Sequence, residues 1–397
     1  MSDPRSISVL GATGSVGETT CALLAEAPDR FRVEALTGNC NAAAMIPWAR
    51  RLRPSFVAMA DLAAAAIVRE ALSDLPIEVA GGNAAVLAAA ERPADWVMAA
   101  IVGAAGLAPT LAAVQRGATV ALANKESLVC AGHLLTTAAK AAGGRLLPVD
   151  SEHNAIFQVF DQTRPEGVER IILTASGGPF RTWSEAKMRH VTPAQALRHP
   201  NWDMGVKISI DSATMFNKGL ELIEAGHLFA MPQERIDVVV HPQSIVHSLV
   251  AYRDGSVLAQ LGLPDMRTPI AVTLYWPERA ACAVDHLDLT RMGDLTFEAP
   301  DLVRFPALRL AREAMRLGGT APAVLNAANE AAVQAFLAEE IGFLDIAAIV
   351  AICLERIPAV PLDSLSTLWE VDRASRAAAL DAIGRHPKAI LTVHAAQ

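Results

Sequence analysis

Two acidic residues separated by one position stand at Asp150 and Glu152, directly after the apolar run Arg145 to Val149. If the chain stays extended there, residues two apart point to the same face, so both carboxylates converge on one point. Carboxylate oxygens are the hard ligands that Mg²⁺ and Mn²⁺ prefer. A lone Asp-x-Glu pair is more often a solvated acidic turn, so a metal site depends on what else lies nearby.

A glycine-rich segment, Gly11 to Gly17, follows the first apolar run and opens a helical pattern. Glycines in such a turn let the backbone approach a pyrophosphate, and the helix N-terminus supplies amide donors. A tight turn that needs only small residues is the alternative, but the strand and helix context favours a dinucleotide. The turn Thr37 to Asn41 after the second strand has no acid for an NAD ribose and no basic residue for a 2′-phosphate, which supports NADP over NAD only mildly.

The segment Lys207 to Glu221 supplies hydroxyl, amide and ammonium donors followed by an acid. Such a mixture suits a phosphate beside a metal ion. Asn217 and Glu221 are four residues apart, so on a helix they share one face. A capped helix with polar surface residues agrees equally well with the composition.

Two further segments have weaker signals. Ser176 to Gly178 follows a strand-like run and can form an amide nest for an anion or an ordinary turn. The loop His199 to Gly205 contains Trp202, which either closes over a substrate as a lid or anchors the loop to the core.

The elements that position these residues follow from the hydrophobic pattern. From Ile7 to about Asp150, short apolar runs alternate with helical patterns, as in the βαβ units of a doubly wound parallel sheet. The predicted strands are Ser6 to Leu10, Arg32 to Leu36, Ser55 to Met59, Trp96 to Val102, Thr119 to Ala123 and Arg145 to Val149. Ligands of such sheets bind beyond the carboxyl ends of the strands. Lys125 and Asp150 follow the last two runs, so we expect them at the same edge as the glycine segment, which favours a metal site.

The rest of the chain predicts a second, α+β domain and then helices. Its predicted strands are Arg170 to Thr174, Ile236 to Val240, Ile245 to Tyr252 and Ser256 to Gln260. Its predicted C-terminal helices are Ala307 to Leu317, Ala321 to Ile341, Leu344 to Arg356 and Thr367 to Arg385. The fold class is therefore α/β, with a Rossmann-like domain at residues 1–149, an α+β domain at 150–276, a linker at 277–306 and a helical bundle at 307–397.

Composition limits the partners and the location. The chain has 397 residues, a formal net charge of −8 and 52% hydrophobic residues, so it can bury a large core. An acidic chain offers no general field for nucleic acid or anionic lipid, and we expect small-molecule partners. We find no signal segment and no apolar stretch long enough to span a bilayer, which predicts a cytoplasmic protein. The five cysteines are scattered and predict reduced thiols.

Six segments taken together go beyond these separate signals. They are residues 11–17, 123–127, 148–153, 175–180, 199–205 and 213–219. In this order and spacing, over nearly the whole chain, they resemble the 1-deoxy-D-xylulose 5-phosphate reductoisomerase family. The resemblance implies a homodimeric enzyme with an NADPH domain, a central catalytic domain and a C-terminal bundle. It implies conversion of a sugar phosphate to 2-C-methyl-D-erythritol 4-phosphate in non-mevalonate isoprenoid synthesis.

The resemblance also assigns residues. It implies that Asp150, Glu152 and Glu221 bind Mg²⁺ or Mn²⁺, and that Lys125 and Glu152 are candidates for proton transfer. The substrate phosphate would contact Ser176, Ser212, Asn217 and Lys218, while Lys125, Ser151 and the loop with His199, Trp202 and Met204 would contact the rest of the substrate. The cofactor-binding residues would be Thr13, Gly14, Ser15, Val16, Gly38, Asn39, Asn41, Asn124, Glu126 and Gly205.

Two other functions compete with this interpretation. An aldehyde or acyl-phosphate reductase begins with a similar glycine turn but needs a catalytic cysteine, and none of the five stands in a suitable motif. A dinucleotide-sensing protein would bind the cofactor without requiring a metal. The turn at Asn39, Cys40 and Asn41 lacks the basic residue that members of the family often carry there, so a strict preference for NADPH is a weaker expectation than the reaction.

Overall fold

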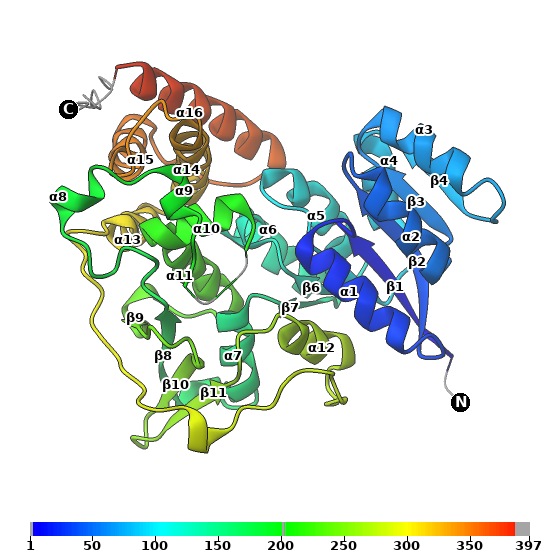
Figure 1. The fold of residues 1–397 in the computed structure, drawn as a ribbon, viewed down its shortest axis with the longest axis horizontal. Helices are drawn as coiled ribbons and strands as arrows, with labels where there is room; N and C mark the ends of the chain where they lie inside the picture. Colours follow the sequence, from blue (N-terminus) through cyan, green and yellow to red (C-terminus); the bar gives the residue numbers. More distant parts are fainter. Residues whose placement is uncertain (1–2, 201, 203, 386–397) are drawn as a thin grey trace, which may run out of the picture. The chain divides into compact units, whose positions relative to one another are not determined.

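The computed structural model describes residues 3–200, 202 and 204–385, and its chain forms two compact units. Unit 1 comprises Met1–Ile172, His227–Met231 and Ile245–Gly293, and unit 2 comprises Leu173–Gly226, Pro232–Ser244 and Asp294–Gln397. Figure 1 shows the chain coloured along the sequence. Asn201 and Asp203 of the expected lid loop lie outside the described residues, as does 386–397 of the expected bundle. The predicted domain boundaries follow a different division and stay a prediction.

Unit 1 contains a parallel sheet of seven strands in the order β4-β3-β2-β1-β5-β6-β7. From β1, the chain first adds strands on one side, β2 to β4, and then on the other side, β5 to β7. This confirms the predicted doubly wound arrangement. The strands are β1 (Arg5–Leu10), β2 (Phe31–Gly38), β3 (Phe56–Met59), β4 (Glu78–Gly81), β5 (Trp96–Ala99), β6 (Thr119–Leu122) and β7 (Arg145–Pro148).

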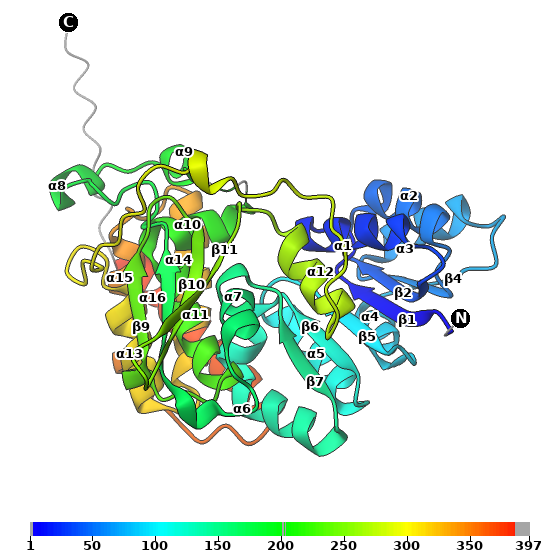
Figure 2. The same ribbon diagram turned by 90° about the horizontal axis from the view of Figure 1, so that it is seen from below.

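Helices cover both faces of this sheet (Figure 2). One face carries α1 (Ser15–Glu26), α2 (Ala42–Leu52) and α3 (Leu62–Ala71). The other carries α4 (Asn83–Glu91), α5 (Leu107–Gln115) and α6 (Lys125–Ala142). With both faces covered, most of the strands are largely apolar, which is why apolar runs predicted all of them except β4.

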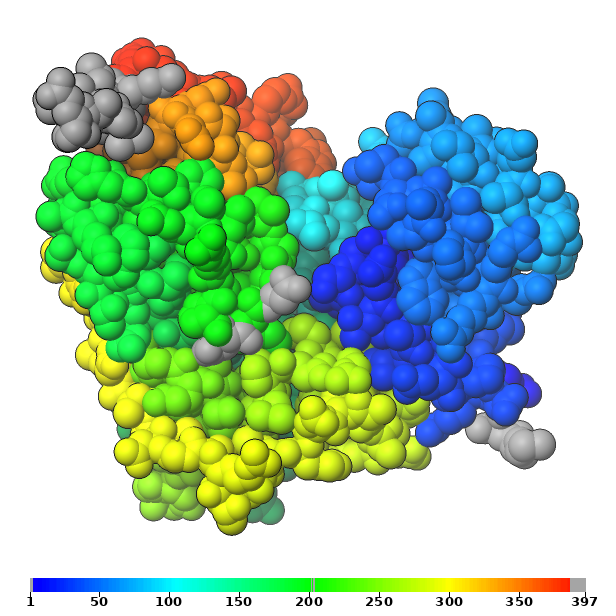
Figure 3. All heavy atoms as spheres, viewed as in Figure 1, coloured from blue at the N-terminus to red at the C-terminus, as the bar shows by residue number. Residues whose placement is uncertain are grey.

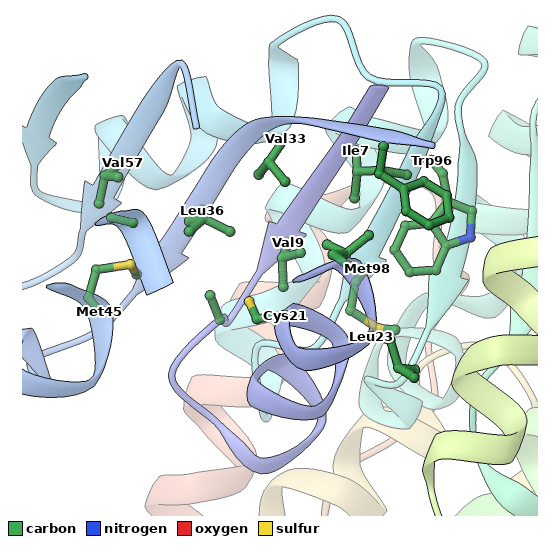
Figure 4. Packing of buried hydrophobic residues seen from close by; sticks show 14 of the residues in the cluster. Ile7, Val9, Cys21, Leu23, Val33, Leu36, Met45, Val57, Trp96 and Met98 are labelled. Atoms are coloured by element: carbon green, nitrogen blue, oxygen red, sulfur yellow. The ribbon is translucent and has the colours of Figure 1, made fainter. Parts of the chain in front are cut away.

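The core of unit 1 lies between the sheet and its helices. Figure 4 shows Ile7 and Val9 of β1, Val33 and Leu36 of β2 and the neighbouring buried side chains. A later helix, α12 (Arg267–Tyr275), joins this core, because the Trp96 indole donates to the Thr273 carbonyl at 3.0 Å. The sheet therefore gains a covering element from a distant part of the sequence.

The sequence analysis was wrong about two details of the sheet. It missed β4, an edge strand whose four residues are exposed or only partly buried, unlike the equally short strands of the interior. It also extended the fifth strand to Val102, whereas β5 ends at Ala99. The carbonyls of Ile101 and Gly103 accept from the side chain of Asn124 instead of continuing the strand ladder.

A second sheet has the strand order β11-β10-β8-β9. Its strands, β8 (Val168–Ala175), β9 (Ile236–Val240), β10 (Val246–Tyr252) and β11 (Val257–Leu261), agree with the predicted ones to within two residues. In unit 1, β10 and β11 form an antiparallel hairpin that packs against α7 (Ser151–Val159). The mixture of helix and sheet confirms the expected α+β character of the middle of the chain.

Unit 2 ends in the predicted helices. They are α13 (Ala307–Leu317), α14 (Ala321–Leu337), α15 (Asp345–Arg356) and α16 (Leu365–Arg385), and α14 packs against the other three. Only α14 differs clearly from its prediction, because it ends at Leu337 rather than Ile341. The same unit contains α10 (Val206–Thr214) and most of α11 (Phe216–Leu228).

The segment expected as a linker is mostly exposed and lies on the surface in Figure 3, coloured yellow. It is nevertheless attached in unit 2, where Glu298 pairs with Val240 through two backbone hydrogen bonds of 2.8 Å. The Phe297 ring stacks on His241 with centroids 4.7 Å apart. Among the described helices, none is long and apolar enough to cross a membrane.

Candidate functional site

The glycine segment forms an open turn between β1 and α1. Gly11 has φ +93°, and a Cβ there would lie 2.6 Å from the Ala100 carbonyl oxygen. A Cβ on Gly17 would lie 2.0 Å from the Gly11 carbonyl oxygen, so α1 packs directly on the turn. A Cβ on Gly14 would meet nothing closer than 3.6 Å, and no described side chain caps α1 at this residue. The amide end of the helix is therefore open to an anion.

Around this turn lie the other residues expected to bind the cofactor. Thr13 and Val16 are half-buried, and Ser15 is exposed in the first turn of α1. After β2, Asn39 and Cys40 are exposed, while the Asn41 side chain accepts from the Ala44 amide at 3.0 Å and caps α2. The carboxyl ends of β1 and β2 are adjacent in the sheet, so these residues share one edge.

The Asn124 side chain has a structural role at the start of α6. Its Oδ1 accepts from the Ser127 amide at 2.7 Å and so caps α6. Its Nδ2 donates to the Gly103 carbonyl at 2.8 Å and to the Ile101 carbonyl. The loop after β5 is thereby fixed to the start of α6. The next two residues, Lys125 and Glu126, are buried in the first turn of α6.

Asp150 and Glu152 lie close together for a different reason than expected. The chain is not extended there, because Asp150 is the N-cap of α7 and accepts from the Glu152 amide at 3.2 Å. Its other oxygen accepts from Lys125 Nζ at 2.7 Å, with both side chains about nine-tenths buried. Ser151 Oγ donates to Glu152 Oε2 at 2.6 Å. A helix cap, not strand alternation, thus groups these residues.

In unit 2, α10 and α11 are separated by Met215, whose φ is +67°. Asn217 and Lys218 occupy the first turn of α11, and both donate to the carboxylate of Glu221, which is completely buried. The expected shared face of Asn217 and Glu221 is confirmed. The first turn of a helix is also its positive end, which favours an anion.

The turn after β8 contains two glycines in the left-handed region, Gly177 at φ +81° and Gly178 at φ +67°. The Gly178 amide donates to Ser176 Oγ at 3.2 Å. A Cβ on Gly178 would lie 2.7 Å from the Ser212 carbonyl oxygen, so this turn touches the end of α10. The structure thus brings the Ser176 turn and Ser212 together.

The expected lid loop is attached to the same turn through His199. His199 Nε2 lies 2.9 Å from Ser176 Oγ, and His199 Nδ1 accepts from the Trp202 amide at 3.0 Å. Burial lowers the pKa of His199, which keeps the ring neutral at pH 7. Because Nδ1 accepts, the neutral ring carries its proton on Nε2 and donates to Ser176. Trp202 and Met204 are half-buried, and Gly205 is the exposed N-cap of α10.

The sequence analysis missed two polar residues beside these groups, Asp211 and Asn329. Asp211 is buried and pairs with Lys207 at 2.6 Å and with Asn329 at 2.8 Å. The spacing of four residues between Lys207 and Asp211 was a usable signal. Nothing local could indicate Asn329, which lies 118 residues farther along the chain.

The cysteines do not form a nucleophile site. Burial raises the pKa of Cys21 to about 12 and that of Cys353 to about 11. Burial also raises the pKa of Cys282, and Cys130 is buried in α6. Cys40 is free and exposed in the turn after β2. A thiol with a raised pKa is a poor nucleophile, so the structure does not favour the acyl-phosphate reductase alternative.

Sequence profiles of known families match most of the chain. Residues 7–132 match the profile described as 1-deoxy-D-xylulose 5-phosphate reductoisomerase, and residues 146–229 match its C-terminal domain. Residues 261–378 match a profile described as DXP reductoisomerase C-terminal domain. The chain belongs to the 1-deoxy-D-xylulose 5-phosphate reductoisomerase family.

Curated members of the reductoisomerase family are similar over nearly their whole length. The chain is 60% identical to 1-deoxy-D-xylulose 5-phosphate reductoisomerase of Rhodospirillum centenum, with 94% of this chain and 92% of that protein covered. It is 54% identical to the protein of the same name from Caulobacter vibrioides, with 97% and 98% covered.

Solved structures of reductoisomerases have the same fold. The enzyme from Zymomonas mobilis in complex with NADPH gives a TM-score of 0.92 at 52% identity, covering 96% of this chain and 99% of that chain. A DOX-P reductoisomerase in complex with NADPH, fosmidomycin and magnesium gives 0.92 at 44% identity, covering 96% and 98%. These matches confirm the predicted fold class.

Proposed function

We propose that this chain catalyses the NADPH-dependent rearrangement and reduction of 1-deoxy-D-xylulose 5-phosphate to 2-C-methyl-D-erythritol 4-phosphate, a step of non-mevalonate isoprenoid precursor synthesis. Membership of the reductoisomerase family over nearly the whole chain supports this reaction. The single observation that carries it beyond family membership is the pairing of acids with lysines. Lys125 with Asp150 in unit 1, and Lys218 with Glu221 in unit 2, supply the hard carboxylate ligands and the cations that a metal and a phosphate require.

Asp150, Glu152 and Glu221 are the proposed ligands of Mg²⁺ or Mn²⁺, and each offers a carboxylate oxygen. The donor chemistry fits such an ion, since all three are hard oxygen ligands. A buried carboxylate such as Glu221 also needs a positive partner, and a divalent ion would add to Lys218 in that role. When bound, the ion supplies Lewis-acid stabilisation of negative charge on substrate oxygens.

The proposed phosphate site consists of Ser176, Ser212, Asn217 and Lys218. In its support, the absence of a side chain at Gly178 lets the Ser176 turn pack against Ser212. The first turn of α11 contains Asn217 and Lys218. Hydroxyl, amide and ammonium donors together suit a phosphate dianion. His199 orients the Ser176 hydroxyl by donating to it.

Lys125 and Ser151 are proposed to contact the rest of the substrate, and Lys125 and Glu152 are the candidates for proton transfer. Lys125 is held by Asp150, Ser151 is held by Glu152, and the Glu152 amide donates to Asp150, so all four belong to one hydrogen-bonded group. A lysine positioned in this way can donate to a substrate hydroxyl or carbonyl. Trp202 and Met204 would cover the substrate and exclude water.

NADPH is the proposed reductant and would supply the hydride for the reduction. Its pyrophosphate would face Gly14 at the open end of α1, beside Thr13, Ser15 and Val16. The other proposed contacts are Gly38, Asn39, Asn41, Asn124, Glu126 and Gly205. Since the Asn41 and Asn124 side chains cap helices, we propose that these residues contribute chiefly through their backbone.

A homodimer is also proposed. In its support, β11 is an edge strand of the second sheet, and Val257, Leu258 and Leu261 on it are exposed apolar side chains. Exposed apolar edge strands are usually covered by a partner. Light scattering after size-exclusion chromatography would measure the mass, and a monomer at micromolar concentration would contradict this proposal. A cytoplasmic location stays a prediction.

The reaction is tested by following NADPH oxidation with 1-deoxy-D-xylulose 5-phosphate, with and without Mg²⁺ or Mn²⁺, and with NADH in parallel. We expect turnover that requires the metal and prefers NADPH, with methylerythritol phosphate as the product. No turnover by folded protein that binds NADPH would exclude this function. Turnover without any metal would overturn the assignment of the three acids.

A further inference from the structure

A buried polar tie connects the helical bundle of unit 2 to the segment proposed to hold the phosphate. Asp211 lies on α10 immediately before Ser212 and is 1% exposed. Its carboxylate accepts from Lys207 Nζ at 2.6 Å and from Asn329 Nδ2 at 2.8 Å. Lys207 is one turn earlier on α10, whereas Asn329 is a fully buried residue of α14.

We infer that Asn329 is a positioning residue for the substrate phosphate, acting through Asp211 on the placement of Ser212. This inference rests on the proposed function, because it takes Ser212 as a phosphate ligand. Asn329 touches neither substrate nor cofactor in this assignment. Its role is to hold α10 at a set position against α14.

The position of α10 matters because the turn at Gly178 packs tightly against the C-terminal end of this helix. A Cβ on Gly178 would lie 2.7 Å from the Ser212 carbonyl oxygen and 3.0 Å from the Ala213 Cα. The two backbones are therefore in direct contact, and a shift of α10 by a few tenths of an ångström would move the Ser176 turn as well. One hydrogen bond from α14 thus influences two proposed phosphate ligands.

The charges of this tie also suit a neighbouring anion. A buried carboxylate one residue from a phosphate ligand would repel the phosphate unless it were neutralised. Lys207 neutralises Asp211, and Asn329 adds a second donor without adding charge. Buried polar groups of this kind can specify one arrangement of packed elements, which an apolar contact would leave less defined.

The chain contains a matched control on the same helix. Asn326 is also completely buried on α14, but its Nδ2 donates to Glu330 on the same helix at 3.1 Å. Asn326 and Asn329 therefore share residue type, helix and burial, but their amides donate to different carboxylates, Glu330 and Asp211. Replacing each by leucine removes the same amide from the same bundle, and only one replacement removes the donor to α10.

The experiment compares Asn329→Leu and Asn326→Leu in the full-length protein. We would measure KM and kcat for 1-deoxy-D-xylulose 5-phosphate at saturating NADPH and Mg²⁺, the Kd of inorganic phosphate by calorimetry, the Kd of NADPH, and the unfolding midpoint. Both variants are expected to be less stable. Only Asn329→Leu is expected to raise KM and the phosphate Kd, by roughly tenfold or more, as for a lost hydrogen bond to a charged group. Neither should change the NADPH Kd.

Each outcome decides the inference. Equal effects of the two variants on KM and on the phosphate Kd would overturn it, because bundle stability alone would then explain them. If leucine prevents folding, the pair Asn329→Ser and Asn326→Ser gives the same comparison, since a serine hydroxyl is too short to reach Asp211. If the wild type binds phosphate without turning over the sugar phosphate, the proposed function fails while the phosphate Kd values still test Asn329. If no phosphate binding can be detected and Asn329→Leu leaves KM unchanged, the inference about Asn329 is also overturned.

Discussion

The two candidate anion-binding regions offer different donor groups, backbone amides in one and side chains in the other. In unit 1, the glycine segment offers backbone amides at the open end of α1, and a Cβ on Gly14 would clash with nothing. In unit 2, the Ser176 turn and the start of α11 offer side chains that are themselves held by hydrogen bonds, Ser176 to His199 and Lys218 to Glu221 of the same helix. A backbone site needs only small residues in the right turn, whereas a side-chain site needs every supporting contact.

This difference predicts how each region fails. Adding one methyl group should damage the backbone site through sterics, with no change in charge. The side-chain site should fail through the loss of single hydrogen bonds or charges, including those contributed by residues far from the ligand. The following predictions test this contrast.

The largest effect is expected for Asp150→Asn. The amide keeps an oxygen that can cap α7 but removes the charge that pairs with Lys125 and would bind the metal. Turnover should fall by more than about 100-fold, while the NADPH Kd stays nearly unchanged. Steady-state kinetics and dinucleotide titration measure both, with Asp254→Asn on an exposed turn as the control. Normal turnover by Asp150→Asn would show that the metal assignment is wrong.

The second test separates two glycines of one turn. Gly17→Ala places a Cβ 2.0 Å from a backbone oxygen and should destabilise the protein by roughly 3 kcal/mol. A Cβ on Gly14 would make only an ordinary contact of 3.6 Å with the Gly11 carbonyl oxygen, so the unfolding free energy of Gly14→Ala should change by less than about 0.5 kcal/mol. Gly14→Ala should instead weaken NADPH binding roughly tenfold. Denaturant titration and NADPH titration would check this pair, and unchanged NADPH affinity in Gly14→Ala would argue against pyrophosphate binding there.

A moderate effect is expected from protonation of His199. Burial lowers its pKa in the folded protein, so the stabilisation from the neutral ring is present above about pH 6.5 and is lost as the pH falls below that value. Protonated Nδ1 can no longer accept from the Trp202 amide. KM for the sugar phosphate should therefore rise several-fold as the pH falls from 7 toward 5.

The variant His199→Asn should flatten this pH dependence, whereas His190→Asn, at an exposed position, should leave it in place. Measuring KM against pH in all three proteins gives the comparison. A wild-type profile that matches that of His199→Asn would mean that the loop is not held through the neutral imidazole.

The smallest effect is expected for Cys40→Ala. Cys40 is exposed in the turn after β2, where the cofactor is proposed to bind, but the proposed reaction needs no thiol. Turnover should remain within about twofold of the wild type, as for most surface substitutions. Loss of activity in this variant would support the alternative function, a reductase that depends on a catalytic cysteine.

Much of the fold could be predicted because its signals are local. Apolar runs located β1, β2, β3, β6 and β7, and the helical period located α13 to α16, each to within about two residues apart from the end of α14. The failures have physical causes. β4 is an edge strand with little buried surface, and beyond the end of β5 the carbonyls of Ile101 and Gly103 accept from the Asn124 side chain.

The candidate site was predictable only in part. Asp150 and Glu152 were chosen for their spacing, but the helix cap that groups them was not foreseen. The shared face of Asn217 and Glu221 followed from helix geometry alone. His199 was assigned through the family resemblance. Its hydrogen bond to Ser176 depends on how the loop packs, which the spacing of hydrophobic residues does not indicate.

The sequence by itself determined the strands and helices, the open glycine turn and the residue types available for chemistry, because these depend on neighbours within a few positions. Only the tertiary structure decided which polar groups pair across long separations in the sequence. Lys125 meets Asp150 across 25 residues, and Asn329 meets Asp211 across 118. Hydrogen bonds at such separations arise from the packing of whole elements. The residues next to each side chain in the sequence do not indicate which distant residue will be its partner.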